Sequence, residues 1–349
     1  YEGHTRPLLR AFMTDLTVKA NDHTRTYDGT TYSGSAGVSY SIPTYDSSLV
    51  YGTLNYTSSD DLRNAGTATV NVDGLYSSQH GYIINYDTGT LTTNKKTLTA
   101  NYTADNKVYD GTTNAVVNGT LNGIVSGDSV TSSNTSANFT DKNVGNSKTV
   151  NIDGIFLEGM HSGNYSISGS ATATANITPK AITADYIADN KVYDGTTNAV
   201  VNGTLAGIIS GDSVTVSNTS ANFTDKNAGE NKTVNIAGIS IGGTDSNNYS
   251  ISSDTTTTAN ITKKELTANY TADNKIYDGT TSAVVSGTLD GVLSGETVTF
   301  SNTTANFTDK NAGTGKTVNI AGISISGVDS INYSISNTSS TTADITKKD

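Results

Sequence analysis

The 349-residue sequence contains no cysteine, no tryptophan and only three prolines. Without cysteine the fold has no disulfides, although this absence does not place the protein in a reducing compartment. No run of residues approaches the roughly 18 apolar residues of a membrane-spanning helix, and no signal-peptide pattern is present. Stability must therefore come from burial of apolar surface and from backbone hydrogen bonds.

Charged residues are also scarce, at 15% of the chain against roughly 25% in average proteins. The formal net charge is −11 and the basic residues are scattered, whereas nucleic-acid binding requires clustered lysine or arginine. We therefore expect no nucleic-acid partner. The sequence begins with Tyr1 rather than methionine, so we interpret it as an excerpt from a longer chain.

What the sequence has in abundance is repetition. The phrase YDGTT begins at Tyr27, Tyr109, Tyr193 and Tyr277, at intervals of 82, 84 and 84 residues. This period is too long for a solenoid repeat and suits a small self-contained domain. The phrases GTL, ANFTDKN and NYSI return with it in the last three copies. The chain is therefore a series of related modules.

The repeat sets the expected domain boundaries. We place the tail of a preceding region at 1–14, a divergent module at 15–96, and three nearly identical modules at 97–180, 181–264 and 265–349. Only two residues separate consecutive copies, which should restrict the angle between neighbours. We expect a stiff monomeric rod. With strands of about eight to ten residues, four modules end to end would span on the order of 130–160 Å.

Nearly every segment has the pattern of a β-strand. Apolar and polar residues alternate, as at Val234 and Ile236, and Asn-Gly, Asp-Gly and Ser-Gly pairs separate the runs. We interpret Ala237-Gly238 as a bulge that shifts the phase before Ile239. About seven short strands per module predict an all-β tandem array of small antiparallel, immunoglobulin-like sandwiches. The alternative is a β-grasp-like module with one short helix, for which 207–210 is suitable.

One repeated tyrosine favours the sandwich. Tyr165, Tyr249 and Tyr333 each follow a tight polar turn and begin a strand. This placement resembles the tyrosine corner of immunoglobulin-like domains, in which the phenol bonds to upstream backbone. A core tyrosine in any other β-module would give the same pattern.

The repeated phrases resemble a known family. KVYDGTT, a GTL turn, an F-x-D-K-N-x-G phrase and a closing NYS-I run are similar to the YDG repeats of bacterial surface proteins. The first module, with its YDGTTYSG opening and TGTLT ending, resembles the neighbouring MBG-type domain. Such modules belong to large filamentous-haemagglutinin-like adhesins exported by two-partner secretion. The resemblance covers roughly residues 15–349 and implies a cell-surface or secreted adhesin whose repeats form a stalk. It brings no catalytic residues.

Signs of catalysis or metal binding are few. The histidines sit at non-equivalent positions and form no catalytic or metal-binding set, so we expect neither an enzyme nor a cofactor. Asp105, Asn106 and Asp110 are the best candidates for calcium, because hard cations prefer oxygen ligands. Alternatively, these side chains bond their own backbone in Asx turns. The four histidines are His4, His23, His80 and His161.

The first module holds nine of the nineteen tyrosines. Aromatic faces bury large areas at low entropic cost, so this module could bind a host or matrix glycan or protein. Its repetition is least exact around Tyr27, which makes that region the first place to look for a ligand. The individual candidates are Tyr32, Tyr40, Tyr45 and Tyr51.

Two functions fit the sequence. The first is a non-enzymatic stalk or spacer that projects an adhesive region from the surface of a bacterial cell. The second is direct recognition of a host or matrix partner through the divergent first module. Near-identical modules with very short joints favour the stalk.

Overall fold

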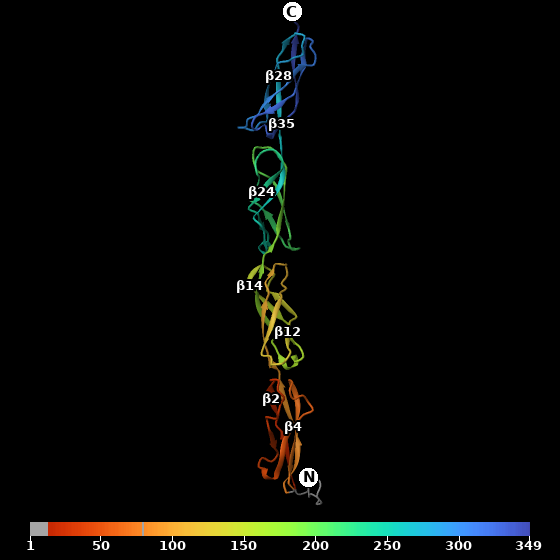
Figure 1. Cartoon of the computed structure of the whole chain (residues 1–349), viewed down its shortest axis with the longest axis vertical. Coiled ribbons are helices and arrows are strands. Elements are labelled where there is room, and N and C mark those ends of the chain that lie inside the picture. Colours follow the sequence, from red (N-terminus) through yellow and green to blue (C-terminus); the bar gives the residue numbers. More distant parts are fainter. Residues whose placement is uncertain (1–12, 79) are drawn as a thin grey trace. The chain divides into compact units, whose positions relative to one another are not determined.

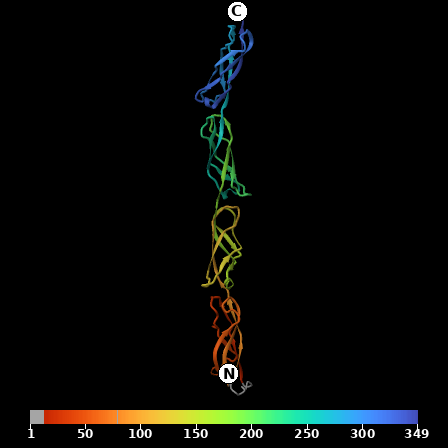
Figure 2. The same cartoon turned by 45° about the vertical axis from the view of Figure 1, so that its right-hand side comes forward.

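The computed structural model describes residues 13–78 and 80–349, so most of the tail predicted at 1–14 lies outside the described residues. The chain divides into two compact units, Tyr1–Thr178 and Pro179–Asp349. Each unit contains two of the predicted modules, and each is described here by itself. In the first unit, the module coloured red to orange is followed by a second bundle of strands (Figures 1 and 2).

The chain is all-β, and its strands form repeated modules. The first module contains β1 (Thr14–Ala20), β2 (His23–Thr26), β3 (Val38–Tyr40), β4 (Val50–Thr57), β5 (Gly66–Ser77), β6 (Tyr82–Asp87) and β7 (Gly89–Asn94). The second contains β8 (Lys96–Thr97), β9 (Thr99–Ala104), β10 (Lys107–Val108), β11 (Val117–Asn122), β12 (Thr131–Ser133), β13 (Ser136–Phe139), β14 (Gly145–Asp153), β15 (Phe156–Glu158), β16 (Tyr165–Ser166) and β17 (Ser170–Thr178).

The second unit repeats this order of strands. Its first module contains β18 (Lys180–Ala181), β19 (Thr183–Ala188), β20 (Lys191–Val192), β21 (Val201–Ala206), β22 (Thr215–Ser217), β23 (Ser220–Phe223), β24 (Gly229–Ala237), β25 (Ser240–Gly242), β26 (Tyr249–Ser250) and β27 (Asp254–Thr262). The last module contains β28 (Lys264–Ala272), β29 (Lys275–Ile276), β30 (Val285–Asp290), β31 (Thr299–Ser301), β32 (Thr304–Phe307), β33 (Gly313–Ala321), β34 (Ser324–Ser326), β35 (Tyr333–Ile335) and β36 (Thr338–Thr346).

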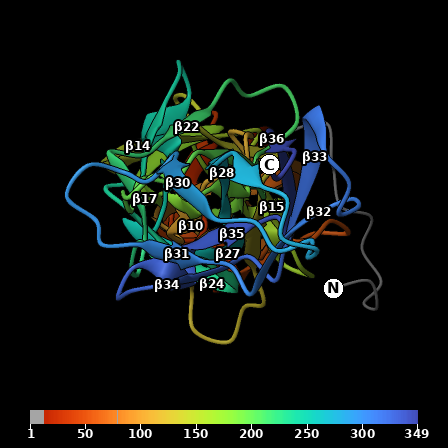
Figure 3. The ribbon, with the colours of Figure 1, turned by 90° about the horizontal axis from the view of Figure 1, so that it is seen from above.

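The last module shows the architecture most clearly. One sheet has the order β29-β36-β33-β32, and a second has the order β30-β28-β35, beside the short pair β31-β34. Viewed end on, β32 and β33 lie on one side of the module and β30 on the other, with β28 and β35 between them (Figure 3). Most pairings are antiparallel, as predicted. The pairs β28–β35 and β29–β36 are parallel, which the sequence pattern did not indicate.

The core of the last module lies between these sheets. Val318 and Ile320 on β33 are 0% and 1% exposed, and they pack with Phe307 and Ile345 of the same sheet. Tyr270 on β28 packs against this cluster from the other sheet. Because side chains alternate across a strand, Asn319 between Val318 and Ile320 faces outward and is exposed. The predicted alternation of apolar and polar residues is therefore confirmed.

The interpreted bulge and the helix of the alternative fold are both missing from the described residues. Ala237-Gly238 is no bulge: Ala237 ends β24, and Gly238 has φ +64 in the turn that leads to β25. The register shift of β24 lies instead between Gly229 and Lys232. The stretch 207–210 forms no helix, and the third module's only helical turn is the 3-10 turn η4 (Ser246–Asn248). No described segment supplies the helix that a β-grasp fold needs.

The predicted tyrosine corner is confirmed in position but reaches further than expected. Each tyrosine follows a 3-10 turn, namely η3 (Ser162–Asn164), η4 or η5 (Ser330–Asn332), and begins a strand. The Tyr165 hydroxyl accepts a hydrogen bond of 2.9 Å from the backbone N–H of Val125, 40 residues upstream. In immunoglobulin-like domains the partner lies only a few residues upstream. Here the tyrosine connects a distant loop to the sheet.

No described helix is long and apolar enough to cross a membrane.

The core makes a prediction about stability. Ile320→Ala should lower the free energy of unfolding of the last module by about 2–5 kcal/mol, because it leaves a cavity in a fully buried site. Ile331→Ala makes the same change at a side chain that is 60% exposed and should change stability by less than about 0.5 kcal/mol. Chemical denaturation followed by circular dichroism measures both. Equal losses would show that Ile320 does not belong to the core.

Candidate functional site: a tyrosine joint between modules

The YDGTT phrase forms a loop around a lysine whose ammonium group is enclosed by hydrogen-bond acceptors, which we call the caged lysine. In the second module, Lys107 Nζ donates hydrogen bonds to Asp110 Oδ1 (2.8 Å), Thr112 O (2.8 Å) and Asn114 O (3.0 Å). Its ammonium group also lies 5.6 Å from the centre of the Phe139 ring. Lys191 and Lys275 make the same three bonds in the next two modules. In the first module Arg25 takes this place and donates to Thr30 O (2.7 Å).

The aspartate and glycine of the phrase set the shape of this loop. Asp28 Oδ1 accepts a hydrogen bond of 2.9 Å from the backbone N–H of Thr30, which is an Asx turn. Gly29 has φ +80, a conformation that glycine adopts without strain. The backbone N–H of Tyr27 donates to Asn94 O (2.9 Å) at the end of the module. These constraints fix the direction in which the tyrosine side chain leaves the loop.

Tyr27 inserts into the neighbouring module. It is 1% exposed, and its buried neighbours Leu98, Val130 and Tyr165 all belong to the second module. The rings of Tyr27 and Tyr165 meet edge to face, with centroids 5.4 Å apart. A methyl group on Gly29 would lie 2.6 Å from Val125 Cγ1, so the glycine also allows the close approach of the two modules.

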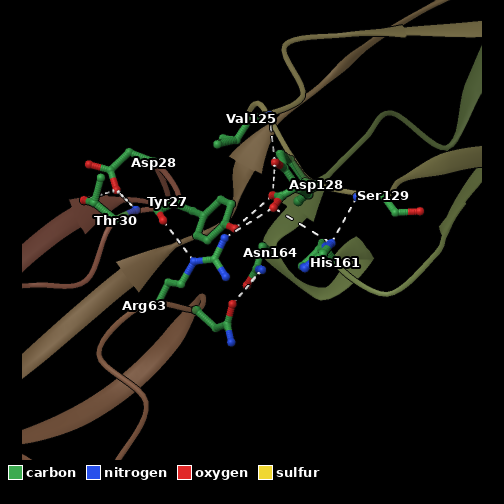
Figure 4. Close-up of polar contacts among 12 residues, drawn as sticks. Tyr27, Asp28, Thr30, Arg63, Val125, Asp128, Ser129, His161 and Asn164 are labelled. Carbon is green, nitrogen blue, oxygen red and sulfur yellow. Dashed lines mark hydrogen bonds and ion pairs between the residues drawn. The ribbon is translucent and has the colours of Figure 1, made fainter.

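A buried carboxylate receives the hydroxyl of the inserted tyrosine (Figure 4). Asp128 Oδ2 accepts hydrogen bonds from Tyr27 (2.8 Å) and Tyr165 (2.5 Å). Arg63 of the first module brings its Nη2 to 3.5 Å from Asp128 Oδ1, and the Asp128 side chain is 0% exposed. Arg63 Nε also donates to Gly29 O (2.9 Å). One carboxylate thus joins two tyrosines and one arginine from both modules.

An asparagine forms a second attachment beside the carboxylate. Asn164, 5% exposed, accepts a hydrogen bond of 2.8 Å from the backbone N–H of Ala65 and donates one of 2.9 Å to Asn64 Oδ1. The strands themselves form the third connection, because only Lys95 lies between β7 and β8. Three separate connections restrict the relative orientation of these two modules. We call this arrangement the first joint.

The second unit contains an equivalent joint between its own modules. Tyr193 is 2% exposed and meets Tyr333 edge to face at 5.5 Å. Glu296 accepts hydrogen bonds from Tyr193, from Tyr333 (2.5 Å) and from Lys226 Nζ (2.8 Å). Asn332 accepts from the backbone N–H of Ala228 (2.8 Å), as Asn164 does from Ala65. Only Lys263 separates β27 from β28.

The two joints achieve the same geometry with different acids and cations. The first pairs the short Asp128 with the long Arg63, and the second pairs the longer Glu296 with Lys226. Lys226 Nζ also lies 5.8 Å from the centre of the Tyr193 ring. Both acids directly follow a Ser-Gly pair, which is Ser126-Gly127 before Asp128 and Ser294-Gly295 before Glu296. This repeated Ser-Gly-acid turn was the available signal for the carboxylate, and the sequence reading overlooked it.

Burial and hydrogen bonding shift the pKa values at the joints. Burial, followed by the hydrogen bond to Asp128, raises the pKa of Tyr165 to about 12. The pKa of Tyr333 is raised to about 12 by burial and by its bond to Glu296. Burial acts to raise the pKa of Glu296, but the hydrogen bonds from Lys226 and the two tyrosines outweigh it and lower that pKa. The carboxylate is therefore ionised and the phenols are neutral at pH 7.

The first module carries no acid at its own acceptor position. Its Tyr82 hydroxyl accepts a hydrogen bond of 2.9 Å from the backbone N–H of Asp46, as the Tyr165 hydroxyl does from Val125. Three residues later the second module has Asp128, whereas the first module has Leu49. Among the described residues, the first module therefore offers no carboxylate at the position that corresponds to Asp128. The first module donates Tyr27 to the first joint and has Leu49 where its neighbour has the acid.

The residues proposed for calcium form hydrogen bonds with other groups of their own module. Asp110 Oδ1 accepts from the backbone N–H of Thr112 (2.8 Å) in an Asx turn, the arrangement named as the alternative. Asn106 Oδ1 accepts from the backbone N–H of Asn176 (2.7 Å). Asp105 donates its backbone N–H to Val116 O (3.0 Å). Across residues 13–78 and 80–349, no group of three or more acidic, histidine or cysteine side chains is placed to hold a metal ion.

The unrepeated histidine in the second module has a structural role. His161 Nδ1 accepts a hydrogen bond of 3.0 Å from the backbone N–H of Ser129, beside Asp128 (Figure 4). Asp245 and Asp329 accept the equivalent bonds from Ser213 and Thr297 in the second unit. His161 therefore replaces an aspartate that fixes the acceptor turn. His4 lies outside the described residues.

The tyrosines of the first module that were proposed to bind a ligand differ in how far they are buried. Tyr32 is 7% exposed and belongs to the core cluster, so it is no surface residue. Tyr40 and Tyr45 are half-buried and lie 4.3 Å apart between ring centroids. Tyr51 is 45% exposed and forms an exposed pair with Tyr76 at 5.9 Å. Tyr27, the suggested centre of ligand binding, is instead enclosed in the first joint.

Comparison with known proteins identifies the repeats. The sequence profile of the YDG domain matches residues 93–175, 178–258 and 262–343. No curated protein sequence matches the chain. Among solved structures, Drosophila N-cadherin EC1-4 is 7% identical, with 95% of this chain and 100% of that chain covered and a TM-score of 0.21. Sidekick-1 immunoglobulin domains 1-5 are 7% identical, with 94% and 78% covered and a TM-score of 0.23.

The joints predict the effect of removing one charge. Glu296→Gln should destabilise the second joint by about 1–3 kcal/mol, because it weakens hydrogen bonds to a charged acceptor in a buried site. The backbone N–H of Ala228, which crosses the joint, should then exchange with deuterium faster. Glu230→Gln is the matched control. Glu230 is exposed and lies two residues after Ala228, so its substitution should leave this exchange rate unchanged. Equal rates in both variants would contradict the role of Glu296.

The joints should also fail at alkaline pH. The pKa of Tyr333 is about 12 in the folded protein and about 10 in the unfolded chain. The folded state therefore keeps a proton that the unfolded state loses, so stability falls as pH rises from 10 to 12. Denaturant unfolding at pH 8, 10, 11 and 12 measures this loss, which Tyr333→Phe should reduce. If the free energy of unfolding of Tyr333→Phe fell just as steeply with pH, the pH dependence would come from other groups.

Proposed function

The chain belongs to the YDG domain family, and from this premise we propose that it is a non-enzymatic stalk segment of a bacterial cell-surface or secreted adhesin. Its role would be to hold an adhesive region away from the cell. The chain itself would act as a monomer. The observation that carries the proposal is the joint, in which one tyrosine of each donating module is enclosed by its neighbour.

The joint suits a stalk because it resists bending at the point where tandem domains are usually flexible. Tandem domains joined by polar linkers move relative to one another unless the interface is large and apolar. Here a strand, a tyrosine–carboxylate group and an asparagine connect the modules separately. Bending at the joint would have to break buried hydrogen bonds to a charged group, which are costly to leave unmade.

Small-angle X-ray scattering of the full chain tests the proposal. A stalk of four modules end to end should have a maximum dimension on the order of 130–160 Å. The double variant Asp128→Ala, Glu296→Ala should broaden the distribution of distances, because both joints lose their carboxylate. A compact particle, or identical curves for the two proteins, would argue against a stiff stalk.

A second candidate function is recognition of a host or matrix glycan or protein by the first module. The exposed pair Tyr51 and Tyr76 favours it, because adjacent aromatic faces supply contact area at low entropic cost. The test is adherence of the full chain to cells, mucin and a glycan array. The double variant Tyr51→Ser, Tyr76→Ser should lose binding by tenfold or more. Absence of binding by the unmodified chain would leave the stalk alone.

A further inference from the structure

The last module presents the donor half of a joint. Lys275 Nζ donates hydrogen bonds to Asp278 Oδ1 (3.0 Å) and Thr280 O (2.9 Å), and the N–H of Thr280 donates to Asp278 Oδ1 (2.8 Å). The backbone N–H of Tyr277 donates to Thr346 O (2.8 Å), as that of Tyr193 does to Thr262 O (2.9 Å). The loop around Tyr277 thus has the same internal bonds as the loops that donate Tyr27 and Tyr193.

The difference lies in what covers this loop. Tyr277 is half-buried, whereas Tyr193 is 2% exposed. A methyl group on Gly279 would meet no atom within 4 Å, whereas one on Gly195 would lie 3.0 Å from Leu293 Cδ1 of the next module. No other described residue forms a hydrogen bond with the Tyr277 hydroxyl. Ala312 is exposed, whereas its counterpart Ala228 is half-buried against Asn332.

We propose that this surface, formed by Tyr277, Gly279, Asn311 and Ala312, docks the acceptor end of another YDG module that is covalently connected to it in the same polypeptide. The occupant is defined by its chemistry. It carries a buried carboxylate three residues after an apolar residue, as in Leu293 and Glu296, together with an Asn-Tyr pair at the start of a strand. The inference rests on the geometry of the joints and holds whether or not the chain serves as a stalk.

The size of the joint favours a partner in the same polypeptide. Each observed joint encloses one tyrosine and a few hydrogen bonds, whereas a stable interface between separate proteins buries roughly 1,200–2,000 Å². A connection of one or two residues supplies the missing affinity, because it raises the effective concentration of the acceptor.

A second copy of this chain does not supply the missing acceptor. Its first module has Leu49 where the acid is required. The acceptors at Asp128 and Glu296 already hold Tyr27 and Tyr193 of their own chain, and Asp212 at the equivalent position of the third module is not free either. Copies of the chain should therefore not associate end to end through Tyr277.

Two extended chains test the proposal. In the first, residues 1–348 are followed by a second copy of residues 265–349, whose acceptor contains the glutamate corresponding to Glu296. In the second, residues 1–348 are followed by a copy of residues 15–96, whose acceptor position holds leucine. Amide hydrogen exchange at residues 277–281 and at Ala312 should slow at least tenfold in the first extended chain. The second extended chain should exchange at the rate of the unextended protein.

Two variants of the first extended chain assign the protection to the joint. Tyr277→Phe, and Glu→Gln at the added position corresponding to Glu296, should each restore most of the fast exchange at Ala312. Exchange in β33 must stay slow in every protein, which shows that the last module remains folded. Equal protection in both extended chains, or protection in neither, would overturn the proposal. Concentration-dependent dimers of the unextended chain that Tyr277→Phe abolishes would also overturn it, because the partner would then be a second copy.

Discussion

The hydrogen bond between an inserted tyrosine and a buried carboxylate is the interaction on which the relation between neighbouring modules depends. Asp128 and Glu296 each bind a tyrosine of their own module and one from the module before. A buried carboxylate is costly without partners, and here part of its solvation is replaced by a side chain from the neighbour. Docking of the modules and satisfaction of the buried charge are therefore one event.

The rest of the repeated phrase supports this interaction. The caged lysine, the Asx turn of the aspartate and the left-handed glycine hold the loop so that the tyrosine leaves it in one direction. The glycine of the phrase also allows the next module to come close. Val125 and Leu293 of the next module pack where a side chain on Gly29 or Gly195 would lie. A phrase of five residues thus contains a scaffold and the one side chain that the scaffold presents.

Much of the fold could be predicted because strand patterns are local. Alternation at Val234 and Ile236 identified a core-facing strand, and the polar turn before Tyr165 identified a tyrosine that bonds to upstream backbone. The parallel pairs β28–β35 and β29–β36 could not be predicted, because parallel partners lie far apart in sequence and leave no turn signal between them. The interpretation of Ala237-Gly238 as a bulge was wrong, because a turn between two sheets shifts the alternation of apolar and polar residues in the same way.

The sequence by itself determined the modules, their all-β class and the short connections between them, since period and alternation are properties of the chain. It also showed that the tyrosine of YDGTT returns at a nearly fixed spacing. Only the tertiary structure decided whose core the tyrosine anchors: Tyr27 lies in the cluster of the second module, beside Asp128, a residue 101 positions away. It also showed that Leu49 stands at the position that corresponds to Asp128. Periodicity shows what is repeated, but a contact between repeats depends on which ends meet in space.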